Sequence, residues 1–373
     1  MQKPAFILTN LILFSVTALI SLVVVPYLAL TVGFDWVEIG ACIALIWFSG
    51  LSITAGYHRL WSHKAYDAHP VLKVILAVGG AMALQNSILH WASDHRIHHK
   101  HVDDNDKDPY SAGRGFWYSH IGWMLREYQS HRYSDYNNCK DLQKDKVVMW
   151  QHNHYLPIML AANLGIPALL GWLNGDVLGM LLLAGVFRLF VVHHVTFFIN
   201  SLAHIWGKQT YTDKNSARDN GLLAVLTFGE GYHNFHHIFE YDYRNGIRWW
   251  QFDPTKWLIN ACSWVGIAKN LRRCPEERIE KARLEMQLKR AQARAATLPN
   301  AEVVIGRVQQ EYEALLQKMT AYYETRKRLL DMKKRKLVRS YEKLDLDFKY
   351  KELKQSWMLA KQRWIQVHRL QFA

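Results

Sequence analysis

Three short stretches of this sequence are rich in histidine. Two carry the spacing His-x-x-His-His, and a third, upstream, carries His-x-x-x-x-His. The histidines are His95, His98 and His99, then His233, His236 and His237, and upstream His58 and His63. On a helix, side chains three or four residues apart share a face, so each triplet projects together. Adjacent imidazoles repel one another when protonated but chelate when neutral, so the pattern predicts a metal site.

His58 and His63 need a special backbone to join such a site. Five residues of α-helix turn through about 500°, so the two side chains diverge by roughly 140°. They can converge on one ion only if the helix ends or bends between them.

The number of histidines predicts more than one ion. Eight imidazoles exceed the roughly four to six ligands that a single metal accepts. Imidazole binds iron, copper, nickel and zinc alike, so the ligands by themselves do not select the metal. A pair of redox metals beside an apolar compartment suits attack on an unactivated hydrocarbon, whereas zinc has no redox chemistry.

Four apolar runs, each long enough to span a bilayer, must position these histidines. They are Ala5–Phe34, Val37–Trp61, Leu156–Trp172 and Val177–Ile199. The short polar segments between the first two and between the last two predict two helical hairpins.

A fifth run, Val71–Trp91, is also long enough to span, but it contains Lys73, Gln85 and Asn86. If it crossed, the histidines before and after it would lie on opposite sides of the membrane. We therefore expect a buried or interfacial helix here, and all eight histidines on one side. The basic C-terminal region marks that side as cytoplasmic, together with both termini.

The charges divide the chain into two unlike parts. Residues 1–270 hold 21 Lys and Arg against 19 Asp and Glu, whereas residues 271–373 hold 25 against 13, which is +12 of the net +14. Such a basic tail is attracted to anionic lipid. The tail carries no finger, basic-zipper or RNP signature, so nucleic-acid binding is not expected. The four scattered cysteines, without a Cys-x-x-Cys pair, fit a reducing compartment.

The tail also predicts helices. Apolar residues recur every three or four positions, as in a coiled coil, and we expect this stripe to pack on the tail itself, on a copy or on a partner helix. They are Val304, Val308, Tyr312, Leu315, Met319 and Tyr322. We therefore divide the chain into a membrane domain, 1–271, and a basic helical extension, 272–373.

Four stretches, "GYHRLWSHKAY", "DHRIHHKH", "NSLAHIWG" and "GEGYHNFHH", resemble the membrane acyl-CoA desaturases of the stearoyl-CoA desaturase type. The resemblance to this histidine-box di-iron family covers roughly Pro4–Leu271. It implies an all-α integral membrane protein, with four transmembrane helices in two hairpins and a cytoplasmic helical cap that holds two metal ions. It adds His204 as a ninth ligand and Asn200 as a water-mediated contact. Among the other histidines, the following match no ligand position: His101, His120, His131, His152, His154, His193 and His194.

The resemblance further implies a substrate tunnel that runs between the spans and past the metals. Gln85, Asn86, Trp91 and Asp94 match positions near the head group or the upper tunnel. Arg126 is expected to contact a phosphate of coenzyme A. We also expect Cys42 and Ile46, four residues apart, to line the closed end of the tunnel.

By resemblance the protein is an oxygen-dependent desaturase that inserts a cis double bond, at position 9, into saturated fatty acyl-CoA. Two iron ions and dioxygen supply the oxidation. The sequence has no G-x-G-x-x-G fingerprint for a bound flavin or nicotinamide, so a ferredoxin-type carrier and its reductase are expected to deliver electrons. We expect a multi-pass protein of a bacterial cytoplasmic (inner) membrane.

Three alternatives stay open at this point. An acyl-lipid desaturase would differ only in the head group of its substrate. A histidine-box hydroxylase or alkane monooxygenase would insert oxygen in place of removing hydrogen. A metal-binding membrane scaffold would use the basic helical tail as its working part.

Overall fold

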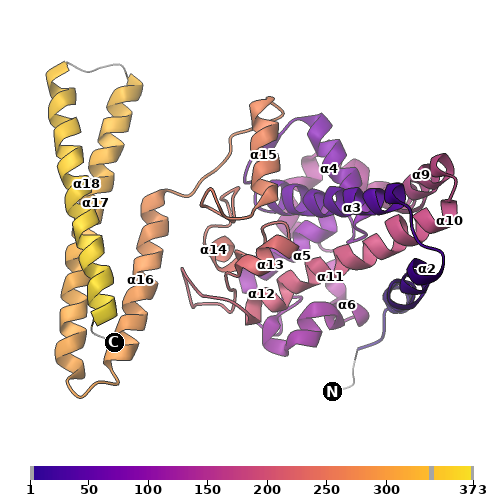
Figure 1. Ribbon diagram of the computed structural model, residues 1–373, viewed down its shortest axis with the longest axis horizontal. Helices are drawn as coiled ribbons and strands as arrows, with labels where there is room; N and C mark the ends of the chain where they lie inside the picture. The colour runs from indigo at the N-terminus through magenta and orange to yellow at the C-terminus, as the bar shows by residue number, and fades with distance from the viewer. Residues whose placement is uncertain (1–3, 336–339, 371–373) are drawn as a thin grey trace. The chain divides into compact units, whose positions relative to one another are not determined.

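The computed structural model describes residues 4–335 and 340–370 (Figure 1). The described residues form two compact units. One holds most of the chain up to Arg273. The other, called the tail unit below, holds the chain from Cys274 onward together with Thr210–Thr212.

Among the described residues, four helical stretches are long and apolar enough to cross a membrane, which confirms the four predicted runs. They are Leu8–Thr31, Trp36–Ser62, Tyr155–Asn174 and Val177–Ile205. The first comprises α1 (Leu8–Leu19), η1 (Ile20–Val24) and α2 (Val25–Thr31), and the second α3 (Trp36–Leu51) and the π-helix η2 (Ser52–Ser62). The third comprises α8 (Tyr155–Leu160), η8 (Ala161–Gly165) and α9 (Ile166–Asn174). The fourth comprises α10 (Val177–Met180), η9 (Leu181–Phe187), α11 (Arg188–Asn200) and α12 (Leu202–Ile205).

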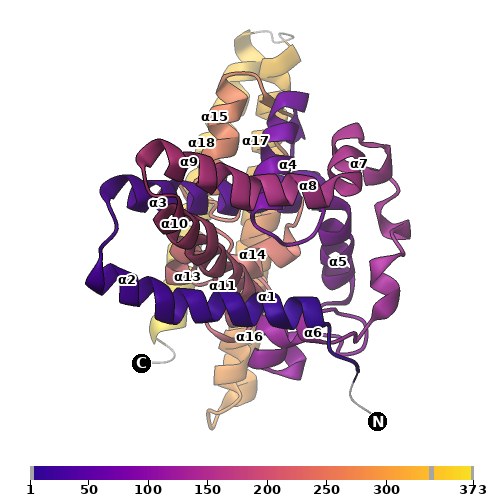
Figure 2. The same ribbon diagram turned by 90° about the vertical axis from the view of Figure 1, so that its right-hand side faces the viewer.

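The two hairpin turns have clear sequence causes. Asp35 and Glu38 form a capping box at the start of α3, in which each side chain accepts a hydrogen bond from the other's backbone N–H. Gly175, in the left-handed conformation, ends α9 at the second turn. The two turns meet, because Asn174 Nδ2 donates to Asp35 Oδ2 over 2.6 Å. In Figure 2 the helices α3, α10 and α11 lie between the first and third spans.

The run Val71–Trp91 is not one helix. It divides into α4 (Pro70–Met82), too short to be a candidate span, and α5 (Ile88–His101). Leu84 and Asn86 in the intervening turn have φ of 52° and 68°, which are left-handed and interrupt the helix. Ser87 then caps α5. The expectation of a non-crossing segment agrees with this arrangement, but the single helix was wrong.

In the sequence, the remaining elements of this unit lie between the spans or follow the fourth span. The α-helices are α6 (Trp123–Leu125), α7 (Lys146–Asn153), α13 (Gly221–Leu226), α14 (His233–Ile238) and α15 (Pro254–Trp264). The short 3-10 and π turns are η3 (Ala112–Arg114), η4 (Tyr118–Gly122), η5 (Ser130–Tyr133), η6 (Asn137–Cys139) and η7 (Leu142–Lys144). The strands β1 (Asp67–Ala68) and β2 (Ala268–Lys269) pair antiparallel, Asp67 opposite Lys269.

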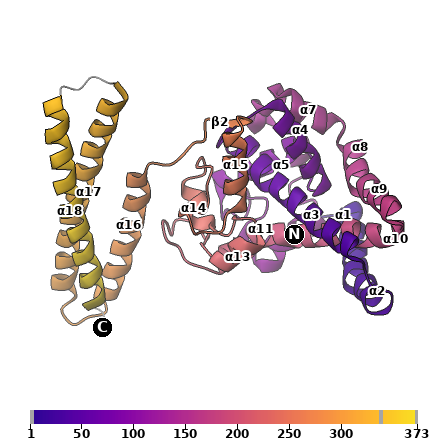
Figure 3. The same cartoon turned by 45° about the horizontal axis from the view of Figure 1, so that its top comes forward.

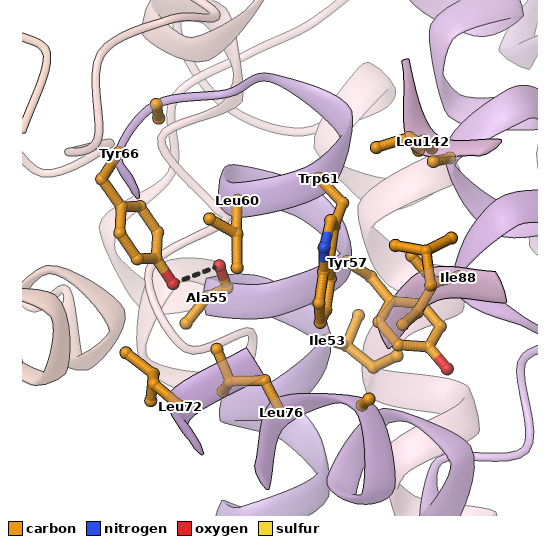
Figure 4. Close-up of a cluster of buried hydrophobic side chains, with 14 of the residues drawn as sticks. Ile53, Ala55, Tyr57, Leu60, Trp61, Tyr66, Leu72, Leu76, Ile88 and Leu142 are labelled. Carbon is orange, nitrogen blue, oxygen red and sulfur yellow. Dashed lines mark hydrogen bonds between the residues drawn. The ribbon is translucent and has the colours of Figure 1, made fainter. Parts of the chain in front are cut away.

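A buried apolar cluster joins η2, α4 and α5. Tyr57 and Trp61 of η2 lie with Leu76 of α4 and Ile88 of α5, and all four are at most 3% exposed (Figure 4). Tyr66 Oη donates to the Ala55 carbonyl over 2.9 Å. This packing fixes the end of the second span against the helix that carries His95, His98 and His99.

The tail unit consists of α16 (Glu276–Ala295), α17 (Ala301–Arg335) and α18 (Ser340–Leu370). Figure 3 shows α17 and α18 side by side. The predicted apolar stripe is the core of this unit, with Val308, Leu315 and Met319 at most 1% exposed. Trp357 and Trp364 of α18 cover it. The stripe therefore packs on the tail itself; self-association stays a prediction.

Candidate metal centre

The structure brings all nine predicted histidines together in two groups. The first group is His58, His63, His95, His99 and His236, and the second is His98, His204, His233 and His237. Within each group the ligand nitrogens lie within 4.8 Å of one another. These are the groups of possible metal ligands found among the described residues. The His-x-x-His-His triplet of α5 and that of α14 each contribute histidines to both groups. A single metal ion would not require this division.

His58 and His63 converge because η2 is a π-helix. The backbone N–H of His63 donates to the carbonyl of His58 over 3.1 Å, an i→i+5 hydrogen bond. This bond places residues five apart nearly one above the other, as they are not on an α-helix. The two imidazole centroids are 4.8 Å apart.

His204 reaches the site through a break in the fourth span. α11 ends at Asn200, Ser201 follows with φ of −107° and ψ of −70°, and α12 carries His204. His204 Nε2 lies 3.1 Å from His233 Nε2. Asn200 and His204 therefore lie on two different helices. Asn200 is in the wall of the cavity described below.

The Nε2 atoms point toward one another inside each group. In the first group the separations are 3.0 Å for His58–His236, 2.8 Å for His63–His95 and 3.0 Å for His99–His236. In the second they are 3.1 Å for His204–His233, 3.0 Å for His233–His237 and 3.3 Å for His98–His237. Nε2 atoms about 3 Å from one another can all reach one ion whose metal–nitrogen bonds are about 2.0–2.1 Å long. The donor set therefore fits two imidazole-bound metal ions.

In five of the histidines, His58, His95, His98, His99 and His204, the other ring nitrogen, Nδ1, faces an acidic or hydroxyl group. Asp108 lies 2.9 Å from His98, Glu240 lies 3.1 Å from His99, and Glu230 lies 3.0 Å from His58. Ser216 Oγ is 2.7 Å from Nδ1 of His204, and Tyr110 Oη is 3.3 Å from Nδ1 of His95. Such partners orient metal-binding imidazoles and leave Nε2 free for the ion.

Glu230 belongs to a buried charge network behind the first group. Its Oε1 accepts from Arg59 Nη2 over 2.8 Å, and its Oε2 accepts from Asn245 Nδ2 over 2.6 Å. Arg59 also pairs with Asp253, the N-cap of α15, at 3.0 Å. Arg59 is 1% exposed, so this fully buried cation has two carboxylate partners.

Burial keeps most of the first group's imidazoles in the neutral form that binds metal. Burial, and then the charges of neighbouring imidazoles, hold the pKa of His63, His95 and His236 well below the usual value. Burial lowers the pKa of His99 to about 4, although Glu240 opposes this. Burial would raise the pKa of Glu230, but His58 and Arg59 outweigh it and lower that pKa to about 2. At neutral pH His63, His95, His99 and His236 are therefore neutral, and Glu230 is a carboxylate.

Both histidine groups open onto one cavity of about 500 Å³. His58 and His95 of the first group and His98 and His233 of the second lie in its wall. Apolar wall residues come from the first, second and fourth spans, namely Leu13, Phe14, Ile53 and Phe197. An apolar chain in this cavity would therefore lie beside both groups.

Five further predicted residues lie in the same wall: Gln85, Asn86, Trp91, Asp94 and Asn200. Gln85 accepts from Trp91 Nε1 over 3.2 Å and donates to Thr196 Oγ1 over 2.9 Å. Asp94 pairs with the buried Arg132 at 2.8 Å. The polar wall thus contains a charge pair and a chain of amide and hydroxyl groups.

The other three predicted substrate residues lie outside this wall. Arg126 donates to the Pro4 carbonyl over 2.6 Å and lies over the Phe6 ring. Cys42 is buried in a cluster with Val25 and Met180, against which Ile46 packs. Their contacts with substrate stay predictions.

The sequence interpretation missed the residues behind the ligands: Arg59, Asp108, Glu230, Glu240, Asp253 and Ser216. Glu230 stands in "GEGYHNFHH" beside a triplet, which was a usable signal, but its target His58 lies 172 positions away. Pairs of that kind are set by the fold.

Comparison with known proteins gives a consistent result. Residues 34–264, which include all nine histidines, match the family model described as fatty acid desaturase. The chain is 49% identical over 243 residues to a probable acyl-CoA desaturase of Schizosaccharomyces pombe, covering 65% of this chain and 50% of that one. It is 44% identical to acyl-CoA desaturase 1 of Saccharomyces cerevisiae, with 67% and 49% covered. It is 36% identical to human stearoyl-CoA desaturase 5 over 75% of this chain and 84% of that one. The chain thus spans about half the length of the two yeast proteins.

Proposed function

Given that the chain belongs to the fatty acid desaturase family, we propose that it is an oxygen-dependent acyl-CoA desaturase that inserts a cis double bond at carbon 9 of a saturated acyl chain. The chain is an integral membrane protein. The observation that carries the proposal is that two groups of inward-facing imidazoles open onto one cavity walled by membrane-spanning helices. We assign the catalytic domain to residues 1–271 and a basic helical extension to 272–373.

The residues fit two iron ions. His58, His63, His95, His99 and His236 would hold one, and His98, His204, His233 and His237 the other, with Asn200 contacting the metals through water. Bound iron would supply the redox chemistry with dioxygen that no side chain provides.

The chain's own residues prepare and orient this site. Asp108, Glu230 and Glu240 hold Nδ1 of their histidines, which presents Nε2 to the metal. Leu13, Phe14 and Phe197 exclude water beside it. Burying each methylene group contributes about 0.8 kcal/mol, which gives affinity but no register along an acyl chain. Register has to come from the head group and from the shape of the cavity.

The electrons of the reaction balance only with an external donor. Desaturation removes two hydrogens, and hence two electrons, from adjacent carbons. Reduction of one dioxygen to two waters takes four electrons, so a carrier must deliver two more, and solvent two protons. We propose a ferredoxin-type carrier with its own reductase.

We further propose that the histidines and both termini face the cytoplasm, because the tail holds +12 of the net +14 charge. Assignment to the inner membrane of a bacterium stays a prediction.

The test is the fatty-acid profile of a desaturase-deficient host that expresses the chain. New cis-9 monounsaturated species are expected with the wild type and with His154→Ala, a surface control whose ring bonds only its own helix. They should be missing with His98→Ala. A gain of oxygen in the products would indicate a hydroxylase. Purified protein given acyl-CoA or intact lipid in parallel separates the acyl-CoA from the acyl-lipid reaction, and unaltered saturated chains in every case would refute the proposal.

A further inference from the structure

The fourth span contains a fully buried arginine. Arg188 is 0% exposed, and no carboxylate forms an ion pair with it among the described residues. A cation inside a membrane-spanning segment is costly and is retained where specific groups bind it.

Each of the three nitrogens of the Arg188 guanidinium donates a hydrogen bond. Nη1 donates to the Met82 carbonyl over 2.7 Å, and Nη2 donates to Asn163 Oδ1 over 2.7 Å. Nε donates to the Ala184 carbonyl of its own helix over 3.2 Å. The cation therefore joins the third and fourth spans to the end of α4.

The acceptors at that end belong to one structural feature. The last carbonyls of a helix lack partners within the helix and form the negative end of its dipole. Asn163 Nδ2 lies 3.4 Å from the Ala81 carbonyl, and His193 Nε2 lies 3.0 Å from the Ala83 carbonyl. Together with Arg188, these side chains bind the terminal carbonyls of α4 from outside the helix.

The turn that follows these carbonyls shapes the cavity. Leu84 and Asn86 have left-handed φ, a conformation that non-glycine residues adopt at a cost and keep only where their surroundings impose it. Leu84, Gln85 and Asn86 all lie in the cavity wall. A displacement of this turn by about 1 Å would shift anything bound against it relative to the histidines.

We infer that Arg188, with Asn163 and His193, is a clamp on the end of α4 that holds the turn of residues 83–87 in place and thereby sets which carbons of the acyl chain lie beside the histidines. Arg188 is a positioning residue, since it is not part of the cavity wall. The inference about carbon position rests on the proposed function.

The test uses the full-length protein in lipid nanodiscs. Arg188→Lys keeps the charge but cannot bond both Met82 and Asn163 through a planar fork. Asn163→Ala removes one arm and serves if the lysine variant does not fold. Thr17→Val is the matched control, because this buried hydroxyl in the first span bonds only to carbonyls of its own helix.

Two measurements are made on each variant. Hydrogen exchange of the amides of residues 83–87 should be about tenfold faster or more in the clamp variants, the factor expected for a lost charge-assisted hydrogen bond. The share of product whose double bond is displaced to neighbouring carbons should rise by a similar factor. Both quantities should stay at the wild-type value in Thr17→Val.

The outcomes separate the claims. Unchanged exchange at 83–87 in both clamp variants would overturn the clamp. Faster exchange with an unchanged double-bond position would overturn its role in setting that position and leave Arg188 merely structural. If the wild type formed no unsaturated product, the proposed function would fail, and the exchange measurement would still decide whether the clamp exists.

Discussion

Replacing Glu230 by glutamine tests how the site holds one metal without disturbing the other. The carboxylate of Glu230 serves His58, Arg59 and Asn245 at once. Glutamine has the same shape, but it has one acceptor oxygen and adds an NH2 group. That NH2 must face at least one donor, so either His58 or Arg59 loses its acceptor.

The size of the effect follows from burial. A lost hydrogen bond to a buried charged group costs about 1.5–3 kcal/mol. Arg59 keeps Asp253 as a partner, which limits the loss of stability to the lower part of that range. Loss of the group that orients a metal-binding histidine weakens metal binding by about 10–100-fold, or about 1.4–2.7 kcal/mol.

The assay is iron content per chain after dialysis against a graded series of chelator concentrations. Glu230→Gln should lose about one of two iron ions at a chelator concentration 10–100-fold below that needed for the wild type, because only the first histidine group contains His58. Asp108→Asn should release the other ion selectively, through His98.

Glu240→Gln is the matched control. Its side chain also faces a histidine of the first group, but it is 52% exposed, so water can replace it. Its effect should stay below about fivefold. Equal loss of both ions in Glu230→Gln, or equal effects of Glu230→Gln and Glu240→Gln, would refute the reasoning.

Four other outcomes are expected. Gly231→Ala should lower the free energy of unfolding by about 1–3 kcal/mol, because a Cβ there would lie 2.2 Å from the backbone of α13. Gly221→Ala should be neutral, because a Cβ there would meet open space. Thermal unfolding compares the two variants, and equal midpoints would be inconsistent with this packing. Ile46→Ala should favour longer acyl chains and Ile46→Phe shorter ones, and an unchanged product profile rejects a role for Ile46 in the closed end. Burial and a neighbouring imidazole lower the pKa of His120 from 6.5 to about 4, so its contribution to stability is complete above pH 6.5 and is lost as pH falls toward 4. The unfolding midpoint of His120→Gln should therefore fall less than that of the wild type between about pH 7 and pH 5, and parallel curves would exclude this effect. Removing the tail unit should leave part of the desaturation in the host assay; complete loss with normal membrane insertion would favour a scaffold role for the tail.

The histidine set was predictable from the sequence because its spacing is local. His95, His98 and His99 share a helix face by the ordinary α-helical repeat. The repeat failed for His58 and His63, where the divergence of roughly 140° applies to an α-helix. No propensity rule predicts from sequence that η2 is a π-helix and not an α-helix. The only indication was that His58 and His63 had to converge on one ion.

The break between α4 and α5 was also hidden. Residues 83–87, "ALQNS", contain neither glycine nor proline, the usual signals for such a turn. Distant groups contact the left-handed residues: His193 Nε2 lies 3.3 Å from the Leu84 carbonyl, and Tyr57 Oη donates to the Asn86 carbonyl over 3.3 Å. Leu84 thus adopts a left-handed conformation against its local preference, whereas Asn86 and the capping Ser87 are residue types that favour such a turn.

The central claim is that the two groups of imidazoles each hold an iron ion beside one cavity. Anomalous diffraction at the iron edge, from crystals of protein purified with its native metal, tests this directly. Two iron peaks are expected, one within bonding distance of Nε2 of His58 and His236, the other of His98 and His233. A single peak, peaks away from these rings, or zinc in their place would contradict the account.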